Sequence, residues 1–244
     1  MRNLFLGAAA SAALVLVSAG AAQAQDDGGG FGGAYVGATI GADFGRTHFA
    51  LLNDPNDTLQ KTQDNRTGLS GGGVFGFNLQ RGDLVVGIEG DVNNGRADAN
   101  VDACTAFGGC WTPAHDSFTT HNHVDSGVAG RVRLRLGWVQ GRNLFYVAGG
   151  YTAQRTTLNL VGDCYNPGAP ATPTVYTYSR GKTVQGFNIG AGIERSLGRH
   201  WVGRAEYLYD GFGGQTYKGD GAEWADRRVS LSENTLRAGI AYRF

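Results

Sequence analysis

Apolar and polar side chains alternate along most of the chain after residue 33, with the period of two that is typical of β-strands. In Gly127–Trp138, for example, Val132 and Leu134 alternate with Arg131 and Arg133. Eight such segments occur: Ala34–Gly45, Leu69–Leu79, Leu84–Asn93, Gly127–Trp138, Leu144–Ala153, Thr183–Arg195, Trp201–Asp210 and Asn234–Phe244. Each has about the 9–11 residues that a tilted strand needs to cross a membrane. In Leu144–Ala153 both faces are apolar or small, so the pattern leaves open which face is outward.

The connections between these segments alternate in length. The short connections are Gln80–Asp83, Val139–Asn143 and Ser196–His200. The long, polar ones are Arg46–Thr67, Asn94–Val124, Gln154–Lys182 and Gly211–Glu233. Short turns at one end and long loops at the other are typical of transmembrane barrels. We therefore expect an all-β fold, an eight-stranded antiparallel transmembrane β-barrel over 34–244, with four long extracellular loops, short periplasmic turns and no second domain.

The first 24 residues have the pattern of a cleaved signal peptide. Arg2 precedes the apolar run Leu4–Val17, and Ala22-Gln23-Ala24 is a small-x-small cleavage site. The alternative, a membrane anchor, is disfavoured because the run is shorter than the ~20 residues of a spanning helix. We expect export, cleavage after Ala24, and a flexible lead-in over 25–33.

Composition narrows the class further. The chain has 41 glycines among 244 residues, 41% hydrophobic and 17% charged residues, and a net charge of +0. It is too apolar and too weakly charged to be disordered. With no net positive charge, nothing attracts the chain to nucleic acid. No cofactor or metal motif stands out, so we expect no cofactor.

One face of the predicted strands is charged. Glu89 and Asp91 lie on one segment, and Arg131, Arg133 and Arg135 lie on the next, which should pair with it antiparallel. Opposite charges across a strand pair stabilise a sheet. Glu194, Arg204, Glu206 and Arg237 extend the set. Because eight strands leave an interior just wide enough for side chains, these residues predict a charge-paired network that fills the lumen. A narrow polar pore remains the alternative.

A soluble β-sandwich or a lipocalin-like barrel would alternate in the same way, so the side facing lipid needs other signals. Aromatic residues gather near the strand ends, as they do at membrane–water interfaces. The last strand carries an apolar residue at every second position and ends in phenylalanine: Leu236, Ala238, Ile240, Tyr242 and Phe244. These signals place lipid outside the barrel.

Several segments resemble a known family. They are Gly87–Asp91, Arg131–Gly137, Gly149-Gly150, Gly190–Glu194, Ala205–Asp210 and the Phe244 end. The chain resembles the small outer-membrane β-barrel proteins of Gram-negative bacteria, similar to the opacity-like and porin-family surface antigens of alphaproteobacteria, over nearly all of 34–244. The resemblance implies an outer-membrane location, contact with outer-membrane lipids, and recognition of the final strand by the barrel assembly machinery. Fold alone does not assign a function, because such barrels host enzymes, adhesins and structural proteins.

The long loops hold the remaining candidate chemistry. Cys104 and Cys110 are the leading disulfide pair, in an oxidising compartment. A bridge from either one to Cys164 is the alternative. His115, Asp116, His121 and His123 share one loop, and they are expected to be solvated side chains rather than metal ligands.

We expect no catalytic residues. His48 with Asp43, and His115 with Asp116, lack a convincing nucleophile partner. We therefore expect a non-enzymatic protein that supports the envelope and displays its loops, where a host or environmental ligand would bind. The alternatives are a small porin-like diffusion channel and, less favoured, a lipid- or peptide-modifying enzyme.

Overall fold

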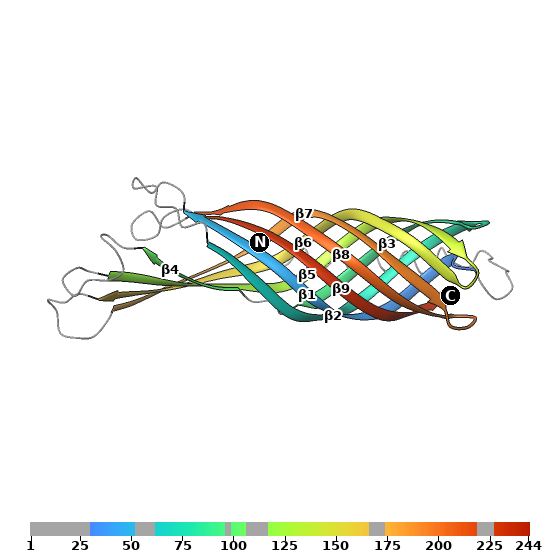
Figure 1. Cartoon of the computed structure of the whole chain (residues 1–244), viewed down its shortest axis with the longest axis horizontal. Coiled ribbons are helices and arrows are strands. Elements are labelled where there is room, and N and C mark those ends of the chain that lie inside the picture. The colour runs from blue at the N-terminus through green and yellow to red at the C-terminus, as the bar shows by residue number, and fades with distance from the viewer. Residues whose placement is uncertain (1–29, 52–61, 96–98, 106–116, 166–173, 219–226) are drawn as a thin grey trace, which may run out of the picture.

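The computed structural model describes residues 30–51, 62–95, 99–105, 117–165, 174–218 and 227–244. The strands in this part of the chain form one antiparallel sheet that closes on itself (Figure 1). They are β1 (Gly33–Leu51), β2 (Thr62–Arg81), β3 (Leu84–Gly95), β4 (Ala99–Thr105), β5 (Ser117–Gln140), β6 (Asn143–Tyr165), β7 (Thr174–Ser196), β8 (Trp201–Tyr217) and β9 (Arg227–Arg243). None of the described residues form a helix long and apolar enough to cross a membrane.

The barrel has eight strand positions, as the sequence predicts. β3 and β4 both pair with β5, at Asn94↔Val128 and Ala99↔Val124, so together they occupy one position. The sheet closes where β3 pairs with β5. Every other neighbouring pair is a hairpin, except β1 with β9, which joins the two ends of the chain.

The strands are longer than the alternation predicts. β6 and β7 each have 23 residues, and their pairing continues to Cys164↔Thr174, well inside a segment that we expected to be a loop. Antiparallel backbone pairing does not require an apolar face. Once a hairpin extends beyond the apolar band, its outward face meets water and carries polar residues such as Arg155, while inward residues such as Thr156 stay buried. With polar residues on both faces, the period-two signal disappears from the sequence.

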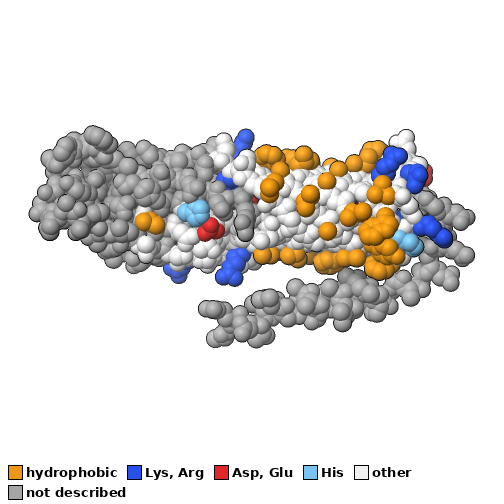
Figure 2. All heavy atoms as spheres, turned by 90° about the horizontal axis from the view of Figure 1, so that it is seen from below, with side chains coloured by type: hydrophobic (Ala, Val, Ile, Leu, Met, Phe, Trp, Pro, Cys, Tyr) orange, Lys and Arg blue, Asp and Glu red, His pale blue; other side chains and the backbone are white. Residues whose placement is uncertain are grey.

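The outer face of the barrel is apolar and the inner face is charged. Ile40 is 74% exposed and Leu134 is 69% exposed, whereas Glu89 is 0% and Arg133 is 1% exposed. A water-soluble barrel has the opposite arrangement, so lipid surrounds this one. Figure 2 shows the apolar side chains as a band, with Lys and Arg at both of its edges. In β6, whose facing the sequence leaves open, Phe145, Val147 and Tyr151 face outward.

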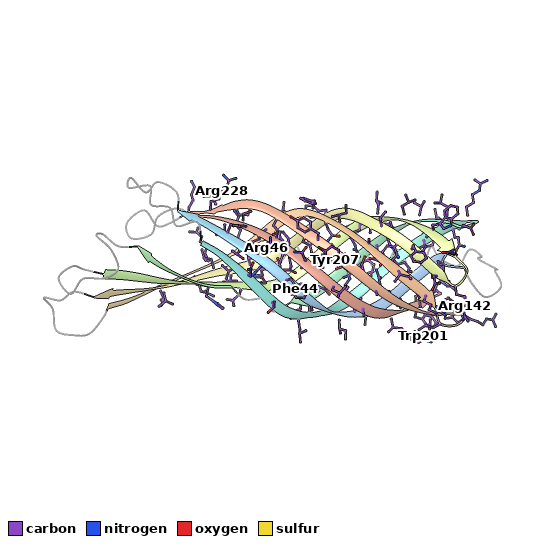
Figure 3. The ribbon with its side chains drawn as sticks, in the orientation of Figure 1. Phe44, Arg46, Arg142, Trp201, Tyr207 and Arg228 are labelled. Carbon is purple, nitrogen blue, oxygen red and sulfur yellow. The ribbon has the colours of Figure 1, made fainter. Side chains whose placement is uncertain are left out.

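Aromatic side chains mark the edges of this band (Figure 3). At the end that carries the short turns, Trp201 and Tyr242 pack edge to face with ring centroids 5.2 Å apart. Tyr242 packs in the same way on Phe244, at 5.3 Å. At the other end, Phe44 and Tyr207 lie on the outer surface. These residues lie where aromatic rings favour the membrane–water interface.

Glycine is needed at two kinds of position. Gly82 and Gly141 begin the short turns after β2 and β5 with φ of +61° and +60°, a region that hairpin turns reserve for glycine. Within β6, a Cβ on Gly150 would lie 2.1 Å from the carbonyl oxygen of Val132. A Cβ on neighbouring Gly149 would lie no closer than 3.5 Å to any atom. The strands therefore approach closely at Gly150.

An apolar cluster closes the lumen at the short-turn end. Phe31 is 2% exposed, its N–H donates to Gln80 Oε1 at 2.5 Å, and its carbonyl accepts from Asn78 Nδ2 at 3.0 Å. The cluster contains Phe31, Val85, Val139, Leu144, Tyr146, Ala148 and Val202. Phe31 belongs to the segment that we expected to be a flexible lead-in, but its side chain is packed inside the barrel.

Candidate functional site: the charged lumen

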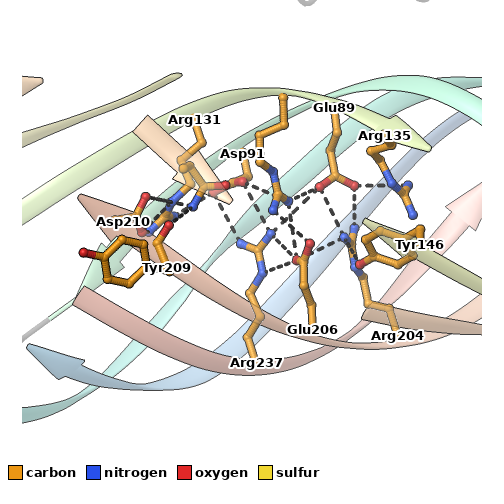
Figure 4. Close-up of polar contacts among 12 residues, drawn as sticks. Glu89, Asp91, Arg131, Arg135, Tyr146, Arg204, Glu206, Tyr209, Asp210 and Arg237 are labelled. Carbon is orange, nitrogen blue, oxygen red and sulfur yellow. Dashed lines mark hydrogen bonds and ion pairs between the residues drawn. The ribbon is translucent and has the colours of Figure 1, made fainter. Parts of the chain in front are cut away.

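Next to the apolar cluster, toward the long-loop end, five guanidinium groups meet five carboxylates inside the barrel. Figure 4 shows how most of these groups converge. The side chains project inward from β3, β5, β7, β8 and β9, because alternate residues of each strand face the lumen. We call this set the lumen network: Glu89, Asp91, Arg131, Arg133, Arg135, Glu194, Arg204, Glu206, Asp210 and Arg237. Its formal charges cancel.

Arg133 lies at the centre of the network. Its Nη1 donates to Glu206 Oε1 at 2.8 Å, and its Nη2 donates to Glu89 Oε1. Arg237 approaches Glu206 from β9, with Nε 2.8 Å from Oε2, and its Nη1 lies 3.3 Å from Asp91 Oδ1. Glu89, Asp91 and Glu206 are therefore each shared between arginines of different strands. This sharing ties opposite sides of the barrel together.

The two ends of the network are anchored differently. Toward the long-loop end, Arg131 donates from Nε and Nη2 to both oxygens of Asp210, at 3.1 and 2.6 Å, and from Nη1 to Asp91 at 2.9 Å. This fork-like pairing is the geometry that guanidinium groups favour. Asp210 in turn accepts from Asn188 Nδ2 at 2.9 Å.

Toward the short-turn end, two tyrosines join the network. Arg135 donates to Glu194 at 2.7 Å and to the Tyr35 hydroxyl at 2.6 Å, and that hydroxyl donates to Glu89 at 2.6 Å. Arg204 donates to the Tyr146 hydroxyl at 2.9 Å. The guanidinium carbon of Arg135 lies 4.0 Å from the Tyr146 ring centroid, within cation–π range. Tyr146 is itself a member of the apolar cluster, so its ring connects the charged layer to that cluster.

The structure brings together all nine residues that the sequence assigns to this network. The predicted pairing of neighbouring strands places Glu89 opposite Arg133 and Asp91 opposite Arg131. Sequence reasoning missed Asp210, Tyr35 and Tyr146 as members. Asp210 and Tyr35 share the inward face of their strands, which the alternation indicates. Tyr146 lies in β6, where the alternation gives no facing.

Beyond the network, the long-loop end of the lumen is lined by buried polar residues. Asp43 Oδ1 accepts from Thr235 Oγ1 at 2.7 Å and from Ser70 Oγ at 3.0 Å. Arg66 donates to Ser126 Oγ at 2.7 Å. From the short-turn end, the described lumen thus passes from an apolar layer to a charged layer and then to a mixed one, where Val124, Leu158 and Leu231 are also buried. Side chains fill its middle.

The final strand completes the barrel. Ala238 lies opposite Ile40, and Tyr242 lies opposite Val36, in the β1–β9 pair that closes the sheet. Leu236, Ile240 and Phe244 are exposed on the lipid side. The residues that we expect to act as an assembly signal therefore form one outward-facing row at the seam between the first and last strands.

The structure describes only some of the candidate cysteine and histidine residues of the long loops. Cys110, His115 and Asp116 lie outside the described residues. In the described backbone, Cys104 lies opposite Thr119 and Cys164 lies opposite Phe118, on the two sides of β5. Two strand spacings, ~9.6 Å, exceed the ~7 Å Cα separation that a disulfide allows, which disfavours a Cys104–Cys164 bridge.

The histidine candidates do not converge in the described chain. His123 Nε2 lies 2.8 Å from Asp125 Oδ1. Asp43 faces the lumen and is 2% exposed, while His48 is exposed, so these two side chains face opposite sides of β1. The part of the chain that the structure describes contains no group of three or more His, Cys, Asp or Glu residues that could hold a metal ion.

These features define a small outer-membrane β-barrel. Residues 9–244 match the family model described as outer membrane protein beta-barrel domain, and the chain belongs to this family. The 25 kDa outer-membrane immunogenic protein of Brucella abortus biovar 1 (strain 9-941) is 25% identical over 173 residues, which cover 71% of this chain. The chain spans only 64% of that relative's length.

Two further proteins are similar. The 31 kDa outer-membrane immunogenic protein of Brucella melitensis biotype 1 is 30% identical over 118 residues, which cover 47% of this chain and 45% of that protein. The crystal structure of the outer membrane protein OprG from Pseudomonas aeruginosa superposes with a TM-score of 0.50 at 12% identity, covering 88% of this chain and 98% of that one. The OprG likeness supports the fold alone. The family match identifies this chain as an outer-membrane barrel, and both Brucella relatives are named as outer-membrane immunogenic proteins.

We predict that Arg133→Ala lowers the free energy of unfolding by about 3–5 kcal/mol, because the lumen network then holds more carboxylates than arginines and one buried negative charge is left uncompensated. The measurement is urea unfolding of the refolded protein in lipid vesicles, followed by tryptophan fluorescence. The control is Arg155→Ala, which removes an exposed arginine and should change stability by less than about 0.5 kcal/mol. Equal unfolding midpoints for Arg133→Ala and wild type would show that the network contributes nothing to stability.

Proposed function

We propose that this protein is a non-enzymatic, non-conducting scaffold of the outer membrane that displays its long loops at the cell surface. The lumen network carries the proposal. Glu89, Arg133 and Glu206 are at most 2% exposed and meet across the middle of the barrel. Phe31 and its apolar neighbours close the short-turn end. A solute would have to break these contacts and separate buried opposite charges, which is energetically costly.

The same arrangement argues against the channel alternative. In a selective pore, a continuous water-filled path is lined by groups that bind a solute and then release it. Here the inward arginines bind carboxylates of the same chain at hydrogen-bonding distance, and those carboxylates are shared among several arginines. The charges of the network thus neutralise one another within the chain, which leaves no net charge in it to attract an ion.

The topology supports surface display. The connections between β1 and β2, β4 and β5, β6 and β7, and β8 and β9 all leave the barrel at one end, opposite the short turns. In outer-membrane barrels the longer connections are extracellular. Binding residues are often found on loops held by a rigid scaffold. We therefore assign recognition of a host or environmental ligand to this end of the barrel. The Brucella relatives are named immunogenic, which supports exposure at the cell surface.

Planar-bilayer recording tests the closed lumen. The refolded protein should insert without producing stable conductance steps. A matched variant removes two acids, two bases and the apolar seal together: Glu89→Ala, Arg133→Ala, Arg204→Ala, Glu206→Ala and Phe31→Ala. This charge-balanced variant should conduct, which shows that the recording detects an open barrel of this size. Reproducible steps from the wild-type protein would refute the scaffold proposal in favour of the channel.

Epitope insertion tests surface display. A short epitope placed between Asn56 and Asp57 should bind antibody on intact cells. The same epitope between Gly82 and Asp83, in a short turn, should bind only after the outer membrane is permeabilised. Binding at the second site and not the first on intact cells would reverse the orientation and remove the display function.

A further inference from the structure

The lipid-facing side of the barrel has a groove near the short-turn end. It has a volume of about 450 Å³ and crosses β3, β5, β6 and β7. Its walls include Leu136 and Trp138 of β5, Phe145 and Val147 of β6, and Ala191 of β7. The size is in the range of small-molecule sites. Because the groove lies within the apolar band, it is open to the hydrocarbon chains of membrane lipids.

Two arginines lie at the end of this groove. Phe145 pairs with Ile193, only two residues, about 7 Å, from Arg195 on the same outward face of β7. Asn143 pairs with Arg195. Arg142 precedes Asn143, and its carbonyl accepts from the Ser196 N–H at 2.9 Å. Both arginines are exposed at the edge of the band, next to the apolar groove. Figure 3 shows Arg142 at the same end of the barrel as Trp201.

The charge around these arginines is mostly positive; the acid of the adjacent short turn is Asp83, whose carbonyl accepts from the Val139 N–H at 2.7 Å. The segments 140–143 and 195–201 contain Arg142, Arg195, Arg199 and His200 but no aspartate or glutamate. Among the described residues, no ion pair engages Arg142 or Arg195, and the one side-chain bond of Arg195, to Asn143 Oδ1, is 3.5 Å long. The lumen arginines differ in this respect, because carboxylates of the chain neutralise them. A pair of guanidinium groups in this setting matches an anion with several oxygens.

We propose that the groove and the two arginines form a binding site for one anionic glycerophospholipid of the periplasmic leaflet. An acyl chain lies in the groove against Phe145 and Ala191, and the headgroup phosphate accepts hydrogen bonds from Arg142 and Arg195. The short turns face the periplasm, so the site lies at the depth of that leaflet. A zwitterionic lipid would fill the groove but brings no net charge for the second arginine. The site does not depend on whether the lumen conducts.

Native mass spectrometry of the refolded chain in mixed micelles tests this site. Phosphatidylglycerol and phosphatidylethanolamine with identical acyl chains are titrated separately. Wild type should bind phosphatidylglycerol about tenfold more tightly than phosphatidylethanolamine, because one charge-assisted hydrogen bond contributes about that much affinity. Arg142→Gln with Arg195→Gln should remove the preference. Arg155→Gln, which changes an exposed arginine in the middle of β6 and outside the groove, should keep it. Equal binding of the two lipids by wild type, or a preference that survives the double substitution, overturns the proposal.

A second pair of variants tests the groove itself. Ala191→Trp fills the groove and should weaken binding of both lipids several-fold. Ile189→Trp adds the same ring to the lipid face of β7 outside the groove and should leave binding unchanged. The shift in gel mobility on heating identifies the folded barrels before each titration. Unchanged affinity in Ala191→Trp, or equal losses in the two variants, shows that no acyl chain occupies the groove and overturns the proposal.

Discussion

The structure depends on charge neutralisation inside a space too narrow for water to solvate every group. An arginine that points into an eight-stranded barrel must find its counter-ion there, because an unpaired buried charge costs several kcal/mol. Arg133 meets this requirement by binding Glu89 on β3 and Glu206 on β8. The contacts join strands far apart in the sequence, so they also specify which strands face each other across the lumen. Replacing such a network with apolar residues is often neutral for stability, which makes that specificity a strong reason to retain it.

The outer surface follows the opposite requirement. Lipid solvates Ile40 and Leu134 but cannot satisfy backbone polar groups, so the sheet must close and leave no open edge within the band. The pairing of β1 with β9 provides that closure, with the terminal apolar row along the seam. At the rim, arginines no longer need a partner from the chain, because water or lipid phosphate supplies one. Arginine therefore has two roles in this protein, and burial decides which one applies. Buried arginines bind the chain's own carboxylates, whereas exposed arginines at the periplasmic edge are available to lipid.

Strict alternation made most of the barrel predictable. It identified the strand number and the inward charges of β3, β5, β7, β8 and β9, since a period of two assigns each residue to a face. It failed where the physical contrast between the faces disappears. In β6 both faces are apolar because Leu144 and Tyr146 belong to the apolar cluster. Beyond the membrane the outward face of the hairpins meets water, so polar residues occur on both faces. The seal formed by Phe31 was not predictable, because it depends on how a glycine-rich segment folds back into the barrel. The lipid groove is also invisible to alternation, because it arises from differences in side-chain size within one apolar face.

The central claim is that the lumen arginines are buried and held by ion pairs. Nitrogen-15 NMR of arginine guanidinium groups, recorded on the refolded protein in micelles, tests it most directly. Arg133 and Arg237 should show slow hydrogen exchange with water and restricted rotation of the guanidinium group, whereas exposed Arg142 and Arg155 should exchange rapidly. Exchange at Arg133 as fast as at Arg142 would mean that water fills the lumen, and it would contradict the account of a closed, charge-paired barrel.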